Sequence, residues 1–340
     1  MQQVQIPRYG GPEVLSIVEA EDPEPGPGEV RIAVRAAGIN FADILARMGM
    51  YKDAPPLPAV MGYEVAGVID AVGQGVEDHR LGQRVLAMPQ FGGQSTMVVV
   101  GQQEAVELPA GMSFEQGATL PVVYLTAYHM LYYLGNLHQG ERVLIHSAGG
   151  GVGLAAIQLA RLRGAEIFGT ASAAKHPRLT ELGVDHCIDY RDQDFEQEVR
   201  RITDGAGVHV ALDAVGASSF GKSYRCLAKN GRLFCFGISS LSPGKKRSLL
   251  AAASGLVQFP IFHPIKLMME NKGVFGVNLG QLWDEAEVMR GQLSSLLELF
   301  GGGQITPTVD RAFPLEQAAE AHQYIQDRKN FGKVVLTCGG

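Results

Sequence analysis

A glycine-rich run stands between an apolar stretch and a helical pattern, where backbone groups can bind phosphate. The run is His146-Ser147-Ala148-Gly149-Gly150-Gly151-Val152-Gly153. It matches A-x-G-x-x-G, a pattern in which Gly150 lets a pyrophosphate approach the backbone and Gly153 allows the helix to pack closely on the strand. The helix N-terminus adds free N–H groups and a positive dipole end. We therefore assign a dinucleotide site, rather than a purely structural turn, to Ala148, Gly150, Gly151, Val152 and Gly153.

The residues after the next predicted strand bear on which nicotinamide cofactor is bound. NAD sites usually place Asp or Glu about 20 residues beyond the glycines, where it bonds the ribose hydroxyls. Segment 169–175 carries no acid, and Glu166 lies at the opposite end of that strand. Ser172 can donate to a 2′-phosphate and Lys175 supplies a positive charge, which favours NADPH over NADH. Ser172 can also cap the next helix while Lys175 is solvated, and the two interpretations can hold together. Tyr190 is a candidate to pack on the adenine.

Alternating strand and helix patterns surround the glycine run and predict the elements that position it. Apolar runs recur about every 20 residues between positions 142 and 237, with helical patterns between them. This alternation is typical of a doubly wound α/β domain, in which ligands bind at the carboxyl ends of the strands. Phe236 and Gly237 end the last of these strands and are therefore assigned to the cofactor site.

The flanking regions differ in pattern and predict a second, β-rich domain. Short alternating runs separated by Gly and Pro fill residues 1–120, and a similar segment occupies 304–340. Apolar residues at steps of three and four predict an amphipathic helix over 281–300. We therefore predict a first domain over 1–123, a dinucleotide-binding domain over 124–277 and a return to the first domain over 278–340.

Composition and charge exclude several classes of protein. Hydrophobic residues make up 46% and charged residues 19% of 340 positions, so a sizeable core can form. The net charge of −6 argues against nucleic acid as a partner. The four cysteines form no C-x-x-C pair, and the most apolar stretch, 249–262, is too short to span a bilayer. We expect a cytoplasmic protein with reduced thiols.

Several stretches together resemble one known family. The motifs are 37–43 (AGINFAD), 61–67 (MGYEVAG), 125–128 (LTAY) and the glycine run. Through them the chain resembles the zeta-crystallin-type quinone oxidoreductases of the medium-chain dehydrogenase/reductase superfamily. Segments 169–176 and 243–247 make it most similar to the vesicle amine transport protein family. The resemblance implies an α/β fold, with a GroES-like β-rich catalytic domain and a doubly wound Rossmann domain.

The resemblance also bears on assembly and on metal. It implies a homodimer, to which the edge strand predicted at 274–277 is suited. Zinc-dependent relatives coordinate catalytic zinc with Cys where this chain has Asn40, and with His where it has Tyr63. The first cysteine is Cys187, so the four-cysteine lobe that holds structural zinc in those relatives cannot form. We therefore expect no zinc. Without a Lewis acid, hydride transfer is easiest to a small electrophile, either a quinone or a C=C bond conjugated to a carbonyl.

Four polar residues receive roles from the resemblance. Asn40 is expected beside nicotinamide and substrate, where its amide can donate to a developing oxyanion, and Thr126 is expected at the nicotinamide end. Tyr51 matches an active-site tyrosine of quinone reductases and polyketide enoyl reductases, and can donate a hydrogen bond or a proton. An exposed loop tyrosine is the alternative. Asp43 either orients Asn40 or Tyr51, or starts a helix.

Two further functions and the role of one segment stay open. An enoyl thioester reductase, acting on a 2-enoyl-CoA or an acyl carrier, shares the hydride chemistry and needs cations for the carrier; Lys245, Lys246 and Arg247 are candidates. A lipid- or vesicle-associated protein that keeps NADPH as a structural ligand is the third hypothesis. Segment 244–269 is interpreted as a buried crossover helix or dimer interface, as the lining of an apolar pocket, or, least favoured, as a membrane contact.

Overall fold

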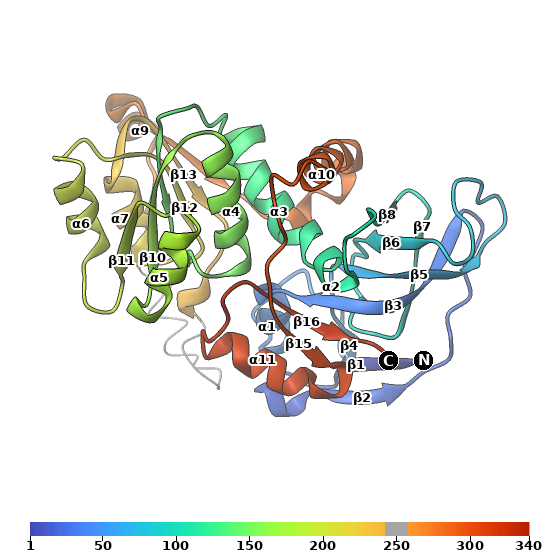
Figure 1. The fold of residues 1–340 in the computed structure, drawn as a ribbon. Coiled ribbons are helices and arrows are strands. Elements are labelled where there is room, and N and C mark those ends of the chain that lie inside the picture. Colours follow the sequence, from blue (N-terminus) through green and yellow to red (C-terminus); the bar gives the residue numbers. More distant parts are fainter. Residues whose placement is uncertain (242–257, 340) are drawn as a thin grey trace. The chain divides into compact units, whose positions relative to one another are not determined.

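The computed structural model describes residues 1–241 and 258–339, which form two compact units (Figure 1). Unit 1 contains Met1–Val123 and the C-terminal segment from Thr306. Unit 2 contains the described residues from Tyr124 to Ile305. The sequence placed the return to the first domain at residue 278, whereas the structure groups 278–305 with unit 2. The candidate cations at 245–247 lie outside the described residues.

Unit 1 is built on a seven-stranded sheet and a smaller three-stranded one. The larger sheet has the order β15-β16-β3-β5-β6-β8, with β7 pairing β3, and the smaller has the order β2-β1-β4. The strands are β1 (Gln2–Ile6), β2 (Ser16–Glu19), β3 (Glu29–Ile39), β4 (Ala59–Val60), β5 (Val65–Val72), β6 (Arg84–Ala87), β7 (Met97–Gly101), β8 (Ala105–Glu107), β15 (Val309–Pro314) and β16 (Lys333–Thr337). The helices are α1 (Phe41–Arg47), α2 (Phe114–Gly117) and α11 (Ala318–Gln326). Along residues 29–36 of β3 buried residues alternate with more exposed ones, so one face of the strand lines the core, and residues 36–39 are all buried.

The C-terminal strands complete the larger sheet of unit 1. β16 pairs antiparallel with β3, with Val334 opposite Ile39, and parallel with β15. Residues from the two ends of the sequence therefore meet where β3 ends and α1 begins.

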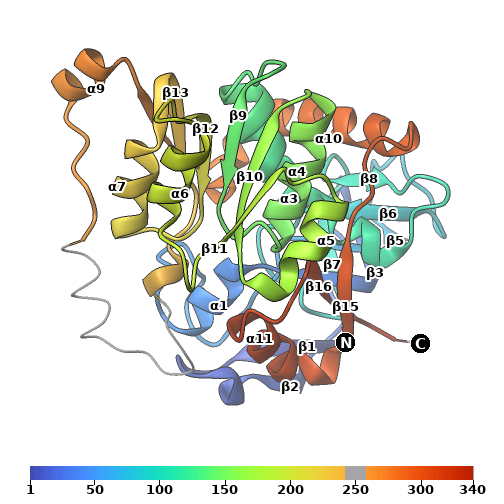
Figure 2. The ribbon, with the colours of Figure 1, turned by 60° about the vertical axis from the view of Figure 1, so that its left-hand side comes forward.

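Unit 2 is a doubly wound α/β domain, as the alternation predicted. Its six strands are all parallel, in the order β11-β10-β9-β12-β13-β14. Strands β9 to β13 can be followed in Figure 2. They are β9 (Arg142–Ile145), β10 (Glu166–Ala171), β11 (His186–Asp189), β12 (Val208–Asp213), β13 (Leu227–Cys235) and β14 (Gly273–Gly276). The helices are α4 (Gly151–Leu162), α5 (His176–Glu181), α6 (Phe195–Ile202), α7 (Ser218–Arg225), α9 (Pro264–Glu270) and α10 (Ala286–Gly301), and α3 (Leu120–Tyr128) leads into the unit. The strand order reverses between β9 and β12, and ligands of such sheets bind at this switch point.

Contacts of β14 and α10 explain why the chain stays in unit 2 beyond residue 277. β14 extends the parallel sheet by pairing with β13, and Gln292 on α10 donates a hydrogen bond to His129 Nδ1. α10 begins five residues later than the helical pattern suggested, because one-turn helices occupy 279–285.

The described part of segment 244–269 is not a buried crossover helix. Phe262 and Leu267 do pack on the core of unit 2. The opposite side of this segment is strongly exposed, with exposed fractions between 64% and 93% for Ile261, Ile265, Met268 and Met269. The burial interpretation is therefore wrong for residues 258–269, which instead present an apolar surface.

Candidate functional site

Asn40 lies at the junction of β3 and α1, and its side chain is held from both ends. Its Nδ2 donates to Glu64 Oε1 at 2.8 Å, and its Oδ1 accepts from Lys333 Nζ at 2.5 Å. Lys333 Nζ also lies 2.5 Å from Glu64 Oε1. An amide has two N–H donors, so one remains for a ligand beside the Glu64 bond. We call the three residues Asn40, Glu64 and Lys333 the amide clamp.

The two charged residues of the amide clamp are almost excluded from solvent, and Asn40 is half-buried. Glu64 is fully buried and Lys333 is 3% exposed. The second carboxylate oxygen of Glu64 accepts from the backbone N–H of Val122 at 2.8 Å. Buried charges persist when they are paired and hydrogen-bonded, and both conditions hold here. The clamp thus fixes which way the Asn40 amide points.

Asp43 serves the start of α1, where it forms a capping box with Asn40. Its Oδ2 accepts from the Asn40 backbone N–H at 2.7 Å, which ties down an N-terminal N–H of α1. Burial raises the pKa of Asp43 to about 7, while this hydrogen bond and the charge of Lys333 act in the opposite direction. The hydrogen bond of Asp43 thus agrees with the interpretation that this residue starts the helix.

Tyr51 belongs to a small aromatic group beside Asp43. Its ring lies edge-on to Tyr63 with centroids 6.4 Å apart, and Tyr63 lies 5.6 Å from Phe91. Burial raises the pKa of Tyr63, and the nearby Asp43 carboxylate and Tyr51 raise it further. Tyr51 is half-buried, so it is not a freely exposed loop residue. Unit 1 therefore gathers all three residues predicted to be catalytic: Asn40, Asp43 and Tyr51.

The donor set of this site does not suit zinc. Its side chains present an amide, two phenols, the Asp43 carboxyl and the Glu64 carboxylate that is paired with an ammonium, rather than the Cys and His donors that zinc prefers. Within residues 1–241 and 258–339, no cluster of three or more His, Cys, Asp and Glu side chains is placed to hold a metal ion.

In unit 2 the glycine run forms the turn from β9 into α4. Ala148 N donates to Thr170 O at 3.0 Å, and Gly150 N donates to Ser147 O at 2.8 Å. A Cβ on Gly153 would lie 2.5 Å from two carbonyl oxygens, so only glycine allows this packing. A Cβ on Gly150 would meet only Ser147 O, at 3.2 Å.

This loop fits a pyrophosphate. The space next to Gly150 is otherwise open, and the first-turn N–H groups of α4, from Gly151 to Gly153, have no partner four residues back. Ala148 is fully buried beneath the turn. The cradle has the form predicted from the sequence, with close packing at Gly153 and an open approach at Gly150.

The residues that follow β10 include Ser172, which was predicted to contact the cofactor. Ser172 precedes the one-turn helix Ala173–Lys175, but its side chain makes no capping hydrogen bond, so the capping alternative is wrong. Asp189, at the end of the adjacent β11, accepts instead from Ala173 N at 3.1 Å and from Arg191 N at 3.0 Å. These hydrogen bonds lower the pKa of Asp189.

The remaining predicted residues lie at separate places in unit 2. Tyr190 is 37% exposed and follows β11, and Thr126 is buried on α3. Phe236 N donates to Asp213 O at 3.1 Å, and a Cβ on Gly237 would come within 2.8 Å of Ala214 O. Phe236 and Gly237 therefore lie at the carboxyl end of β12, on one side of the switch point.

Sequence reasoning missed Glu64, Lys333 and Asp189. Glu64 lies inside the motif 61–67, whose pattern assigns it no role of its own, and Lys333 opens a run of otherwise apolar residues. A charged residue inside an apolar motif or at the start of a buried strand was the available signal, because such a charge needs a partner.

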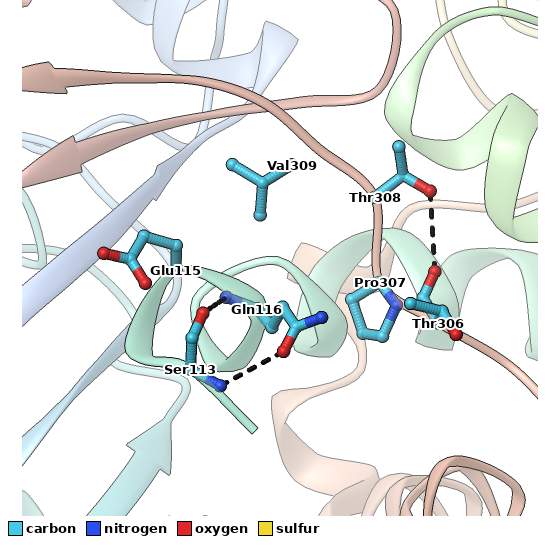
Figure 3. A pocket seen from close by; sticks show the side chains of 7 residues that line it. All are labelled: Ser113, Glu115, Gln116, Thr306, Pro307, Thr308 and Val309. Atoms are coloured by element: carbon cyan, nitrogen blue, oxygen red, sulfur yellow. Dashed lines mark hydrogen bonds between the residues drawn. The ribbon is translucent and has the colours of Figure 1, made fainter. Parts of the chain in front are cut away.

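One surface pocket of unit 1 lies apart from these groups (Figure 3). It is lined by Ser113, Glu115, Gln116, Thr306, Pro307, Thr308 and Val309. The polar groups of Ser113 and Gln116 bond each other in a capping box at the start of α2. None of the predicted catalytic residues lines this pocket.

Comparison with known proteins decides the family. An alcohol dehydrogenase GroES-like domain matches residues 26–134, and a zinc-binding dehydrogenase family matches residues 182–336. The human synaptic vesicle membrane protein VAT-1 homolog is 42% identical over 94% of this chain and 81% of its own length. The chain belongs to the medium-chain dehydrogenase/reductase superfamily. Its motif resemblance and its pairing of GroES-like and Rossmann-type domains are thereby confirmed.

Solved structures place this superfamily member in the quinone-oxidoreductase-like branch. Quinone oxidoreductase from Escherichia coli, complexed with NADPH, has a TM-score of 0.88 at 31% identity, covering 99% of this chain and 100% of that one. CurK enoyl reductase has a TM-score of 0.86 at 31% identity over 99% of both chains. The human VAT-1 homolog-like protein has a TM-score of 0.86 at 33% identity, covering 100% of this chain and 98% of that one.

The names of some relatives mention a vesicle membrane, which bears on the membrane interpretation. Throughout the described part of this dehydrogenase/reductase, every helix is too short or too polar to cross a bilayer.

Proposed function

We propose that this chain is a zinc-independent, NADPH-dependent reductase that transfers hydride to a quinone or to a C=C bond conjugated to a carbonyl. The observation that carries the proposal is the amide clamp. It presents an oriented N–H donor, instead of metal ligands, at the position where zinc-dependent relatives carry cysteine. A hydrogen-bond donor suffices to stabilise the oxyanion of an acceptor that is already electrophilic.

The residues of unit 2 are proposed to bind the cofactor. NADPH, when bound, supplies a hydride from C4 of its nicotinamide. Residues 148–153 hold the pyrophosphate through backbone N–H groups, and Ser172 and Lys175 hold the 2′-phosphate. The Ser172 hydroxyl makes no capping hydrogen bond to the helix that follows, which supports its role in holding the phosphate. Tyr190 packs on the adenine, and Thr126, Phe236 and Gly237 line the nicotinamide end.

The residues of unit 1 are proposed to act on the substrate. Asn40 donates its second N–H to the substrate oxygen that gains negative charge. Tyr51 holds a proton for delivery to the reduced product, and Tyr63, whose raised pKa keeps its hydroxyl protonated, supports it. Asp43 fixes the start of α1 and so the position of Asn40.

Enoyl thioester reduction is the second candidate. It is supported by the likeness to CurK enoyl reductase and by 37% identity, over 93% of this chain, to the pikromycin polyketide synthase component PikAII of Streptomyces venezuelae. A lipid- or vesicle-associated NADPH-binding protein with little catalysis is the third, supported by the names of the VAT-1 relatives. We further propose a cytoplasmic homodimer without nucleic-acid partners.

A side-by-side assay tests these proposals. NADPH oxidation is measured with a panel of quinones and a panel of 2-enoyl-CoA thioesters. The Asn40→Ala variant is measured in parallel, and we expect it to lower turnover while hardly changing the affinity for NADPH. Fast quinone turnover alone supports the first candidate. Fast turnover of one thioester with slow quinone reduction supports the second. Tight NADPH binding with neither activity supports the third and overturns the first.

A further inference from the structure

A buried polar network crosses the switch point of the unit 2 sheet. His146 follows β9, Thr170 lies on β10, Asp213 ends β12 and Ser223 lies on α7; none is more than 3% exposed. His146 Nε2 lies 2.9 Å from Ser223 Oγ, and its Nδ1 lies 3.1 Å from Thr170 Oγ1. Ser223 Oγ lies 2.6 Å from Asp213 Oδ2, which Ser219 Oγ contacts at 2.7 Å. The network therefore joins three neighbouring strands to the first turns of a helix.

The Asp213 carboxylate sets the direction of the hydrogen bonds. An ionised carboxylate only accepts, so the Ser223 hydroxyl donates to Asp213 and accepts from His146 Nε2–H. Nδ1 of a neutral imidazole then accepts from the Thr170 hydroxyl. Burial lowers the pKa of His146, although the charge of Asp213 opposes this shift, and the ring is accordingly neutral. One arrangement of protons satisfies both ring nitrogens.

Two turns with unusual backbone geometry adjoin this network. Ser147, directly after His146, has φ +53°, and Ala217, directly before α7, has φ +51° and ψ −129°. L-residues rarely adopt these conformations, which persist only where the surroundings hold them. Asp213 Oδ1 accepts from two backbone N–H groups before Ala217, at 2.8 and 3.2 Å. The same carboxylate thus fixes one turn directly and is linked through Ser223 to the residue that begins the other.

We propose that His146, Ser223 and Asp213 form a positioning relay that holds both turns in the conformation that binds the dinucleotide. This inference rests on the proposed function, because the turns border the switch point assigned to NADPH. The relay acts through the backbone of the glycine run and of residues 214–217. It extends to the loop after β13, where Ser239 N donates to Ala214 O at 3.1 Å.

Substitutions on the relay are compared with a matched buried hydroxyl elsewhere in unit 2. Ser223→Ala and His146→Leu each break the relay, and His146→Gln restores an N–H near the position of Nε2. The control is Thr203→Val, because Thr203 bonds Val199 O and Gly207 N near the start of β12, at the opposite edge of the sheet. Ser223→Cys keeps the volume and a weak donor in case Ser223→Ala does not fold. The readouts are the Kd for NADPH and the amide hydrogen exchange of the protein without cofactor.

The expected result separates the relay from general stability. Ser223→Ala and His146→Leu raise the Kd for NADPH about tenfold, and His146→Gln recovers most of this loss. Both turns, 147–153 and 215–219, lose exchange protection. Thr203→Val lowers Tm but leaves the Kd and this protection unchanged. Unchanged Kd and protection in Ser223→Ala, or an equal effect of Thr203→Val, overturns the relay. If the wild-type chain fails to bind NADPH, the proposed function fails, and the exchange data alone then decide the relay.

Discussion

At the Asn40 side chain, one amide group lies between an ammonium and a carboxylate that are both nearly excluded from solvent. Removing one partner of such a pair leaves a buried charge uncompensated. We expect Lys333→Met to lower the free energy of unfolding by about 3–5 kcal/mol, measured by urea denaturation, and to lower kcat. Adding Glu64→Gln should recover part of the stability but not the turnover. A Lys333→Met variant as stable as the wild type would contradict the clamp.

His322 on α11 is a second buried residue whose charge state affects stability. It is fully buried, and burial lowers its pKa from 6.5 to about 3, with the charge of Arg47 acting in the same direction. Above pH 6.5 the ring is neutral in both states. Between pH 6.5 and about 3 the unfolded chain takes up a proton that the folded chain does not, so stability falls by up to about 1.4 kcal/mol per pH unit.

The His322 contribution is measured as the difference between the wild type and His322→Leu. The difference is needed because Asp43, with its raised pKa, takes up a proton preferentially in the folded state over part of the same range. We expect unfolding free energy to fall less steeply with decreasing pH in His322→Leu. Parallel slopes for His322→Leu and wild type would show that His322 titrates normally.

Lys175 tests the choice of cofactor. Its charge is proposed to meet the 2′-phosphate, so Lys175→Glu should weaken NADPH binding about tenfold or more and change NADH binding little. As the control, Lys229→Glu makes the same change of net charge at an exposed residue early in β13, at the opposite edge of the sheet. It should change neither the Kd for NADPH nor the Kd for NADH. Equal losses for the two cofactors in Lys175→Glu would remove Lys175 from the 2′-phosphate site.

At the scale of elements, the turn from β9 into α4 contains one glycine required for packing, Gly153, and one that leaves space for a ligand, Gly150. Gly153→Ala places a methyl group 2.5 Å from two carbonyl oxygens, so we expect both lower Tm and weaker NADPH binding. Gly150→Ala meets only one oxygen at 3.2 Å and occupies the open approach. It should weaken NADPH binding while changing Tm little. A fall in Tm as large as that of Gly153→Ala would show that Gly150 serves packing instead.

The same elements show what the sequence can predict. The strand–glycine–helix order of the β9–α4 turn was predicted, because its signals are local: an apolar strand, glycines at fixed spacing and helical periodicity. The amide clamp was not predicted, because Lys333 and Asn40 lie 293 residues apart and meet only through the pairing of β16 with β3. The late start of α10 likewise depends on one-turn helices that periodicity does not distinguish from a longer helix.

At the scale of the whole molecule, the exposed apolar surface on 261–269 lies next in sequence to β14, an edge strand. Apolar side chains beside an unpaired edge favour association, and a second copy is the proposed partner. We expect twice the 36.4 kDa chain mass by light scattering, and Met268→Glu combined with Met269→Glu should shift the protein toward monomer. Leu81→Glu, at an exposed apolar residue of unit 1, should not. A monomeric wild type at micromolar concentration would contradict the dimer.

The return of the chain to unit 1 has a consequence for synthesis on the ribosome. All of unit 2 emerges before β16, and a nascent chain folds from its N-terminal side as it appears. Until Lys333 has left the exit tunnel, Glu64 has no ammonium to pair with. Residues 36–39 of β3 likewise lack β16 as a partner strand. Chains that stop short of residue 333 should therefore have an incomplete unit 1 and a complete unit 2. The amide clamp therefore cannot form until residue 333 has been synthesised, long after Asn40 and Glu64 have left the ribosome.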